Sequence, residues 1–462
     1  MTPAQFRDST VRVRRYVLIL MESAVIGALS GLACVAVRLF FRLLQQVITG
    51  ESGLLSSAAA HLPLWRRGIT PALGGLAALA VLAISRRLGA ISGFKDYVEA
   101  VRLEEGHISL RPTLWRTISS AFSIATGAAI GREGSMIQFA AAVVSSLGRR
   151  VKHVQLPLAQ QVACGVAAAV AAAYQAPIAG MFFALEIVIG RFAWDEVPSL
   201  LAAAVAGGTV SRALLGAGPL FAPRLFPLHG LLGIDLPHAS LLLPMAVLLG
   251  VLGPLYSWLV RSLQGARKLP VALFWSGALV GALSLFTTEV WGNGDAGLLS
   301  IMQSSPALAM VLVVLLCRIC ATTLCVGTGA VGGVFTPTLF AGSAMGLLAG
   351  HMMHIANPPL FAIIGMGCLL AAVTHAPLMA TFMAVELTGQ WPLLPLALIC
   401  NLVAWQIAIR ISPRSRSLYA LASPVPTDSF AEDTSQILAN SHASFHARNS
   451  LDQQISQTEV TQ

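Results

Sequence analysis

Several runs of apolar residues in this chain are long enough, or nearly so, to cross a membrane as helices. The hydrocarbon core of a bilayer requires about 20 predominantly apolar residues. The clearest runs are at 16–37, 241–260, 271–286, 307–326 and 393–411. Of the 462 residues 56% are hydrophobic and 11% are charged, whereas about a quarter are charged in soluble domains. We therefore predict an all-α polytopic membrane protein.

Other apolar segments are shorter or are interrupted by Gly and Pro. Non-helical backbone is stable at membrane depth only where protein or a water-filled cavity surrounds it. In transporters, such broken helices line the pathway of the substrate. The broken segments therefore predict a transport pathway.

Basic residues at the N-terminus predict its orientation. Four arginines precede the first run, and no short apolar region with a small-residue cleavage site follows, so we expect a cytoplasmic arm over residues 1–15 and no signal peptide. The net charge of +9 fits basic residues beside cytoplasmic helix ends, as at 86–87 and 149–152, and gives no reason to expect nucleic-acid binding. The polar segment 421–462 is predicted to be a disordered tail, also cytoplasmic.

The cysteines and histidines do not predict a metal site. The seven cysteines lie scattered through apolar segments. Cys317 and Cys320 have the spacing of a redox motif, but inside a hydrophobic run they are expected to be small packing residues. None of the ten histidines has ligand spacing with an acidic partner. We expect no disulfide, no metal and no cofactor.

The chain contains an internal repeat. Residues 126–131 (TGAAIG) match 328–333 (TGAVGG), and 176–186 match 376–386, which aligns Glu186 with Glu386. Chance recurrence of Ala-Pro and Gly-rich stretches is the simpler alternative, but two matches in the same order with nearly the same offset favour a true repeat. We predict two related halves, 16–215 and 235–420, meeting at a site formed by helix N-termini.

A charged pair, Arg132 and Glu133, interrupts the glycine-rich stretch of the first half. The apolar run 136–144 predicts a helix that begins near Arg132, and free N–H groups at such a helix start attract anions. Glu133 can occupy this anion site as a tethered anion, which protonation or a mobile anion would release. Its simpler role is to complement the helix dipole or to pair with Arg132, but an ionisable residue within a membrane is a functional candidate.

These motifs resemble those of the CLC chloride channels and proton/chloride exchangers. The segment 131–135 (GREGS) is similar to the family's GREGP motif, with Ser135 replacing the final proline, and 333–337 (GVFTP) is similar to its GxFxP motif. Tyr419 follows the last long apolar run, where the family has a pore tyrosine. The resemblance covers about residues 16–420. It implies a homodimer with one pathway per protomer, each built from two inverted repeats of tilted, partly broken helices.

The resemblance also implies roles for individual residues. Glu133 would be the gating glutamate. The anion would be bound by backbone and side-chain groups of Gly134, Val334, Phe335, Tyr419 and Ser92. Chloride offers no shape to recognise, so a site with several donors and a helix dipole suits it. Tyr419 could instead be an interfacial belt tyrosine, and Ser92 lies in a stretch that keeps only Ser-Gly of the family's GSGIP motif, with Lys95 in the place of its proline.

The resemblance leaves proton coupling open. Proton-coupled members usually carry two successive glutamates after the apolar run, whereas here Glu186 is followed by Ile187, which cannot carry a proton. We expect channel-like, voltage-gated-type or weakly coupled chloride movement, with Glu186 as the candidate proton acceptor. Strict proton/chloride antiport, and transport of fluoride or nitrate, are the alternatives.

A different class of protein is suggested by residues 292–295 (GNGD), which spell the GxGD motif of intramembrane aspartyl proteases. Such an enzyme needs a second aspartate on a facing helix to share the acid and base roles. Asp96, Asp195 and Asp235 all lie near expected loops, and the repeat does not involve Asp295. We therefore favour a transporter over an enzyme.

The sequence predicts a multi-pass protein of a bacterial inner membrane that transports chloride. Its expected partners are chloride, protons where transport is coupled, membrane lipid and a second copy of the chain. The resemblance implies a role as an electrical shunt, in which chloride compensates charge when protons are pumped or consumed under acid stress.

Overall fold

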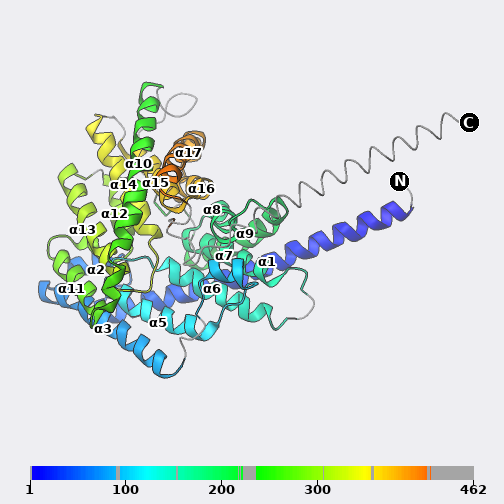
Figure 1. The fold of residues 1–462 in the computed structure, drawn as a ribbon, viewed down its shortest axis with the longest axis horizontal. Helices are drawn as coiled ribbons and strands as arrows, with labels where there is room; N and C mark the ends of the chain where they lie inside the picture. Colours follow the sequence, from blue (N-terminus) through cyan, green and yellow to red (C-terminus); the bar gives the residue numbers. More distant parts are fainter. Residues whose placement is uncertain are drawn as a thin grey trace, which may run out of the picture. The chain divides into compact units, whose positions relative to one another are not determined.

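The computed structural model describes residues 3–89, 94–151, 154–216, 218, 220–221, 236–304, 306–354, 358–413 and 417. In this part of the chain the regular structure is helical, and the β-type pairing is a single bridge between Gly131 and Gly333 (Figure 1). The predicted all-α class is confirmed. Contacts group Met1–Tyr419 into one unit.

The helices of the first half vary widely in length. In order they are α1 (Pro3–Thr49), α2 (Leu55–His61), α3 (Leu64–Arg87), α4 (Tyr97–Leu103), α5 (Leu110–Ala125), α6 (Glu133–Gly148), α7 (Leu158–Tyr174), α8 (Pro177–Phe183), the π-helical turn η1 (Ala184–Ile189), the short turn η2 (Trp194–Glu196) and α9 (Val197–Leu215). Because α1 starts at Pro3, residues 3–15 of the predicted arm are helical and continuous with the first run.

The second half begins with the long helix α10. Its elements are α10 (Leu236–Ser262), η3 (Gln264–Lys268), α11 (Ala272–Ser284), η4 (Thr288–Val290), α12 (Asp295–Ser304), α13 (Leu308–Gly327), α14 (Phe335–Met352), α15 (Pro358–Thr374), α16 (Pro377–Thr388), η5 (Trp391–Leu393) and α17 (Leu394–Ile411). The predicted tail, 421–462, lies outside the described residues.

Among the described residues, six helices are long and apolar enough to span a membrane. They cover 13–49, 64–87, 194–215, 240–268, 308–327 and 391–411. Four of them contain or closely match predicted runs. The run at 271–286 instead forms α11, of 13 residues, which is too short to span. The spans at 64–87 and 194–215 were not predicted because Gly, Pro and charged residues interrupt their apolar pattern.

The buried centre of each half is a short helix packed on all sides. α7 is rich in alanine and almost entirely buried, and α15 is buried from Pro359 to Thr374. Small residues also let helices approach closely: a Cβ on Gly277 or Gly281 of α11 would lie 2.1 or 1.9 Å from a carbonyl oxygen of α3. Such contacts through small residues are typical of helix packing in membranes.

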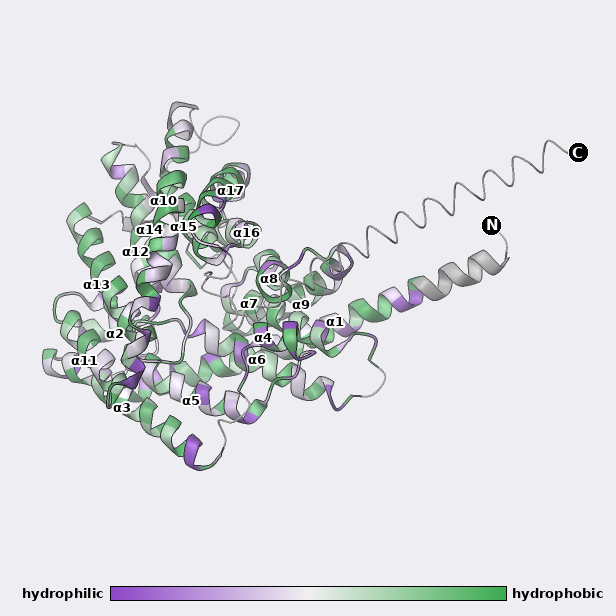
Figure 2. Cartoon of the chain, viewed as in Figure 1, coloured by the Kyte–Doolittle hydropathy of each residue, from purple (hydrophilic) through white to green (hydrophobic). Residues whose placement is uncertain are grey.

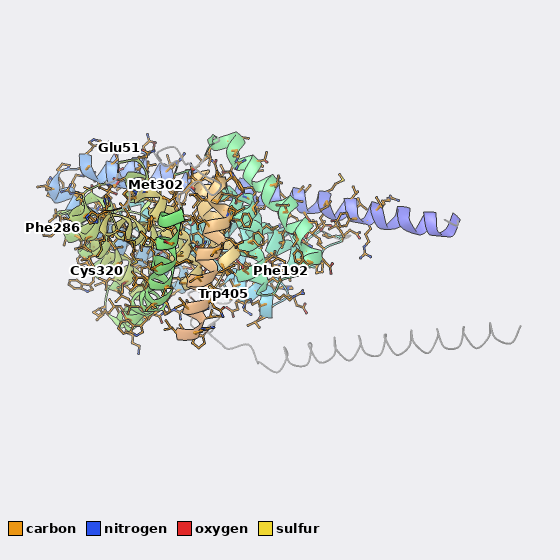
Figure 3. The ribbon with its side chains drawn as sticks, turned by 90° about the horizontal axis from the view of Figure 1, so that it is seen from above. Glu51, Phe192, Phe286, Met302, Cys320 and Trp405 are labelled. Carbon is orange, nitrogen blue, oxygen red and sulfur yellow. The ribbon has the colours of Figure 1, made fainter. Side chains whose placement is uncertain are left out.

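The outer faces of the long helices are apolar, as lipid contact requires (Figure 2). Two of the side chains labelled in Figure 3 are exposed: Cys320 on α13 and Phe286 just after α11. Cys320, expected as a packing residue, is exposed on α13, because the buried face of that helix is the one that carries Arg318.

The sequence repeat is also a structural repeat. Gln175 and His375 are non-glycine residues with positive φ, 56° and 60°, at equivalent positions of the two halves. The next residues, Ala176 and Ala376, share an unusual conformation, φ −122° and ψ 79° against −125° and 78°. The two halves therefore turn the chain in the same way before α8 and before α16.

Candidate functional site

Two glycine-rich loops, one from each half, pair directly. The Gly131 N–H donates to the Gly333 carbonyl and the Gly333 N–H donates to the Gly131 carbonyl, each at 2.7 Å. The bridge is antiparallel, the direction expected for inverted repeats. This pairing brings together the N-termini of α6 and α14, which are anion-attracting ends.

The first loop leads into α6, whose start matches the prediction. Arg132 is the residue before the helix and Glu133 is its first residue. A Cβ on Gly134 would come within 3.0 Å of the Gly333 nitrogen, so this position requires glycine for the close approach of the two backbones. Gly134 therefore lies at the contact between the halves.

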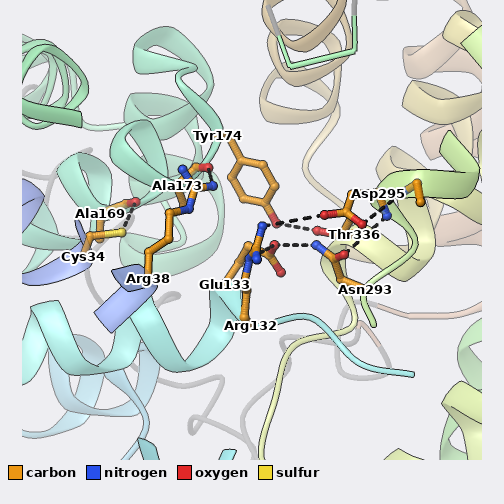
Figure 4. Close-up of polar contacts among 11 residues, drawn as sticks. Cys34, Arg38, Arg132, Glu133, Ala169, Ala173, Tyr174, Asn293, Asp295 and Thr336 are labelled. Carbon is orange, nitrogen blue, oxygen red and sulfur yellow. Dashed lines mark hydrogen bonds and ion pairs between the residues drawn. The ribbon is translucent and has the colours of Figure 1, made fainter. Parts of the chain in front are cut away.

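Glu133 is buried at this junction, and one of its two carboxylate oxygens is hydrogen-bonded. Its Oε1 accepts a hydrogen bond of 2.7 Å from the Asn293 side-chain amide, whereas its Oε2 is buried with no hydrogen-bond partner in the described structure. The Arg132 Nε is 3.9 Å from Oε1, which is an ion-pair distance but too long for a hydrogen bond. Figure 4 shows the Glu133 carboxylate facing Asn293.

The segment that supplies Asn293 is the GNGD motif. The Gly292 N–H donates to the Gly127 carbonyl at 3.3 Å, and the Asp295 carboxylate lies 3.6 Å from an Arg132 nitrogen. Asp295 also begins α12, where it accepts from the Ala296 N–H at 2.9 Å. The pairing with Arg132 accounts for Asp295 without a protease mechanism. The motif thus docks the second half onto the first glycine loop.

The second loop leads into α14, with Val334 before the helix and Phe335 as its first residue. N–H groups of a first turn have no partner within their own helix. The buried Phe335 ring packs against Tyr174, with ring centres 5.2 Å apart. The Tyr174 hydroxyl is 3.1 Å from the Thr336 hydroxyl, and both side chains are buried (Figure 4). Hydroxyl groups therefore lie beside this helix start.

A buried cation, Arg38 of α1, also belongs to the surroundings of Glu133. Its guanidinium donates to the Ala173 carbonyl at 2.9 Å (Figure 4). Arg38 also interacts electrostatically with Glu133 and Arg132. The positive charge near the gate candidate thus comes from two arginines. Because Arg132 also faces Asp295, part of that charge is balanced.

Glu186 is engaged at a different helix start. Its carboxylate accepts from the Leu378 and Met379 N–H groups of α16, at 3.2 and 2.7 Å. In the other half, Glu386 accepts from the Ile178 and Ala179 N–H groups of α8, at 3.2 and 2.8 Å. Glu186 therefore caps α16, which contains Glu386, and Glu386 caps α8, which is followed directly by the turn η1 that contains Glu186.

The predicted site residues are placed as follows. Glu133, Gly134, Val334 and Phe335 come together at the paired loops. Ser92 and Tyr419 lie outside the described residues. Ser135, which replaces the family's proline, donates to the Ser120 hydroxyl at 2.7 Å. Sequence reasoning gave no role to Arg38 or Tyr174, and it noted Thr336 only as part of the GVFTP motif. It considered residues 292–295 as a protease motif, set that class aside and assigned Asn293 no role.

Known proteins match this chain over most of its length. A family model described as "Voltage gated chloride channel" matches residues 73–408. A putative chloride channel protein, ClcB-like, from Ralstonia nicotianae is 39% identical over 82% of this chain and 91% of its own. The voltage-gated ClC-type chloride channel ClcB of Citrobacter koseri is 36% identical over 83% of this chain and 94% of its own.

Solved structures share the fold. A slow cyanobacterial Cl−/H+ antiporter superimposes with a TM-score of 0.75 at 24% identity, over 87% of this chain and 96% of its own. A CLC-type fluoride/proton antiporter superimposes with a TM-score of 0.71 at 22% identity, over 87% of this chain and 98% of its own. The matches agree with the paired helix starts and the repeat, and the chain belongs to the CLC family of voltage-gated chloride channels.

Proposed function

We propose that this protein transports chloride across a bacterial inner membrane through the junction of α6 and α14. The observation that carries the proposal is the position of Glu133, a buried carboxylate at two converging helix N-termini with one oxygen unbonded. A carboxylate in such a place occupies the site that a mobile anion needs. Relatives named as chloride channels support chloride as that anion.

In this proposal Glu133 is the gate, and the backbone N–H groups of Gly134, Val334 and Phe335 bind the anion that replaces it. Ser92 and Tyr419 would complete the site from segments outside the described residues. Protonation of Glu133 removes its charge, so the carboxylate no longer competes with chloride for the helix ends. Transport, not catalysis, is the activity we assign.

Proton coupling is proposed to be weak. A proton that leaves Glu133 needs another titratable group or water on its way through the protein. Ile187 offers none, and Glu186 is held by two backbone N–H groups of α16. Strict proton/chloride antiport is the alternative, because one structural neighbour is named as a Cl−/H+ antiporter. Fluoride is the second alternative anion, since another neighbour is a fluoride/proton antiporter, and nitrate is a third.

We also propose a homodimer in the inner membrane with both termini in the cytoplasm. Exposed apolar side chains on α9 and α17, among them Val205 and Ile399, offer a surface for a second copy. Such a dimer acts as an electrical shunt when chloride movement compensates the charge of protons. A monomeric mass in detergent and in lipid would contradict the dimer.

Reconstitution into liposomes with simultaneous chloride and pH recording tests the function. Under a chloride gradient, we expect chloride efflux with little accompanying proton movement. Absence of chloride flux would contradict the proposed function. Sustained uphill proton movement at a fixed ratio to chloride would support strict antiport. Flux of fluoride or nitrate that is faster than chloride flux would indicate that anion as the substrate.

Glu186→Gln tests the proton-acceptor role, with Glu386→Gln as a matched control. Each substitution weakens one carboxylate cap at a helix start, so we expect both to destabilise the protein by a similar amount, about 1–2 kcal/mol, with chloride flux retained. Thermal unfolding and the liposome recordings measure these effects. Selective loss of proton movement in Glu186→Gln would contradict a purely structural role and identify Glu186 as the acceptor.

A further inference from the structure

The segment 291–295 places one amide side chain against the Glu133 carboxylate from the other half of the protein. Asn293 is 5% exposed, and its Nδ2 donates to the Glu133 Oε1 at 2.7 Å. Its Oδ1 accepts from the Asp295 N–H at 3.3 Å. This second bond fixes which end of the amide faces the carboxylate, because only the NH₂ group can donate.

The backbone that carries Asn293 is held on both sides. The Gly292 N–H donates to the Gly127 carbonyl, and the buried Arg318 donates to the Gly292 carbonyl at 3.0 Å. A Cβ on Gly127 would lie 2.5 Å from the Trp291 ring. The backbone that carries the Asn293 amide is therefore held in place independently of Glu133. Little conformational freedom of this segment is lost when the amide donates to the carboxylate.

We propose that Asn293 is a positioning residue that holds the charged Glu133 carboxylate in the anion site, and so sets how readily the gate releases. The inference rests on the proposed function, because it describes the holding of the proposed gate. A hydrogen bond to an ionised carboxylate is stronger than a neutral one and favours the charged form. Asn293, from the second half, is thus the hydrogen-bond donor that holds the proposed gate Glu133, from the first half.

Other charged and titratable groups lie around Glu133. Arg132 is at ion-pair distance from it, and Arg38 and Cys34 of α1 interact with it electrostatically. Asp295 of α12 pairs with Arg132, and Tyr174 of α7 contacts the Thr336 hydroxyl of α14. Asn293→Ala changes none of these groups and adds no charge, although it also removes the acceptor of the Asp295 N–H. A change in the pH dependence of flux in that variant therefore reports on the Asn293 side chain.

Two variants of Asn293 separate the donor from the packing. Asn293→Asp has nearly the same shape and keeps the oxygen that accepts from the Asp295 N–H, but it loses the donor and adds a negative charge. Asn293→Ala removes the whole amide. We expect both to shift the pH of half-maximal chloride flux upward by about one unit, equivalent to a tenfold change in gate release. Unchanged pH profiles in both folded variants would overturn the inference.

The double variant Glu133→Ala/Asn293→Ala tests whether Asn293 acts through the gate. We expect it to match Glu133→Ala alone, because without the carboxylate there is nothing for the amide to hold. The control is Asn401→Ala: Asn401 is buried and donates to the Thr381 hydroxyl at 2.9 Å, on α17 and α16, and its loss should leave the pH profile unchanged.

The outcomes distinguish the role of Asn293 from the role of Glu133. If Glu133→Ala changes the pH dependence but the Asn293 variants do not, the positioning role of Asn293 is wrong and Glu133 is still supported as the gate. If the wild type carries no chloride, or if Glu133→Ala keeps the wild-type pH dependence, the proposed function itself fails. An additional effect of Asn293→Ala in the Glu133→Ala background would show that Asn293 acts on something other than the gate.

Discussion

The Glu133→Gln protein is expected to carry chloride at a rate that no longer changes with pH. Gln has the shape of the protonated glutamate and cannot regain the charge that competes with chloride at the helix starts of α6 and α14. Without that competition, flux at neutral pH should rise roughly tenfold, the factor that the loss of one charge-assisted bond allows. Chloride efflux from liposomes over a series of pH values measures both effects.

Glu386→Gln is the matched control for this experiment. Glu386 is also a carboxylate bound to backbone N–H groups at a helix start, that of α8. If any such carboxylate could gate the pathway, both variants would lose their pH dependence. We expect only Glu133→Gln to do so, and wild-type pH dependence in that variant would show that Glu133 is not the gate.

The start of α6 could be predicted because its determinants are local. Glycines precede it, an apolar run follows it, and both are close to Glu133 in sequence. The pairing with the second loop followed from the repeat, since equivalent segments of inverted halves face each other. The length of α1 could not be predicted, because the charged residues before Tyr16 suggested an arm although they are compatible with helix.

The partners of Glu133 depend on tertiary packing. Asn293 is 160 residues away in sequence, and no spacing rule connects it to the gate candidate. The GNGD motif was recognised, but its chemistry depends on what faces Asp295, and in the structure that is Arg132. The motif therefore drew attention to a segment that contacts Glu133, but it did not show which contacts that segment makes.

The glutamates of the second motif were aligned by the repeat but assigned from the resemblance. Glu186 was predicted as a possible proton acceptor, and in the structure its carboxylate accepts from the N–H groups at the start of α16. An inverted repeat exchanges equivalent contacts between its halves, so Glu186 and Glu386 had to meet equivalent partners. The alignment of Glu186 with Glu386 therefore implied equivalent partners for the two side chains. The sequence alone did not show which groups these partners would be.

Gly333→Pro is expected to abolish chloride binding. The Gly333 N–H donates to the Gly131 carbonyl at 2.7 Å, and proline has no N–H to donate. Its ring would also enter the contact where Gly134 approaches within 3.2 Å of a Cβ at this position. Because the pairing holds the two helix starts together, its loss moves the Val334 and Phe335 N–H groups away from the anion. Calorimetric titration with chloride in detergent measures the loss.

Two further variants separate the backbone from the side chains at this position. Gly333→Ala keeps the N–H, and its Cβ would lie 3.2 Å from the Gly134 nitrogen, which a small shift can relieve. Val334→Ala changes only packing before α14, because the proposed ligand is its backbone N–H. Both should retain chloride binding with at most a severalfold loss of affinity. Normal chloride affinity in a folded Gly333→Pro protein, verified by its thermal unfolding, would mean that the paired loops do not form the anion site.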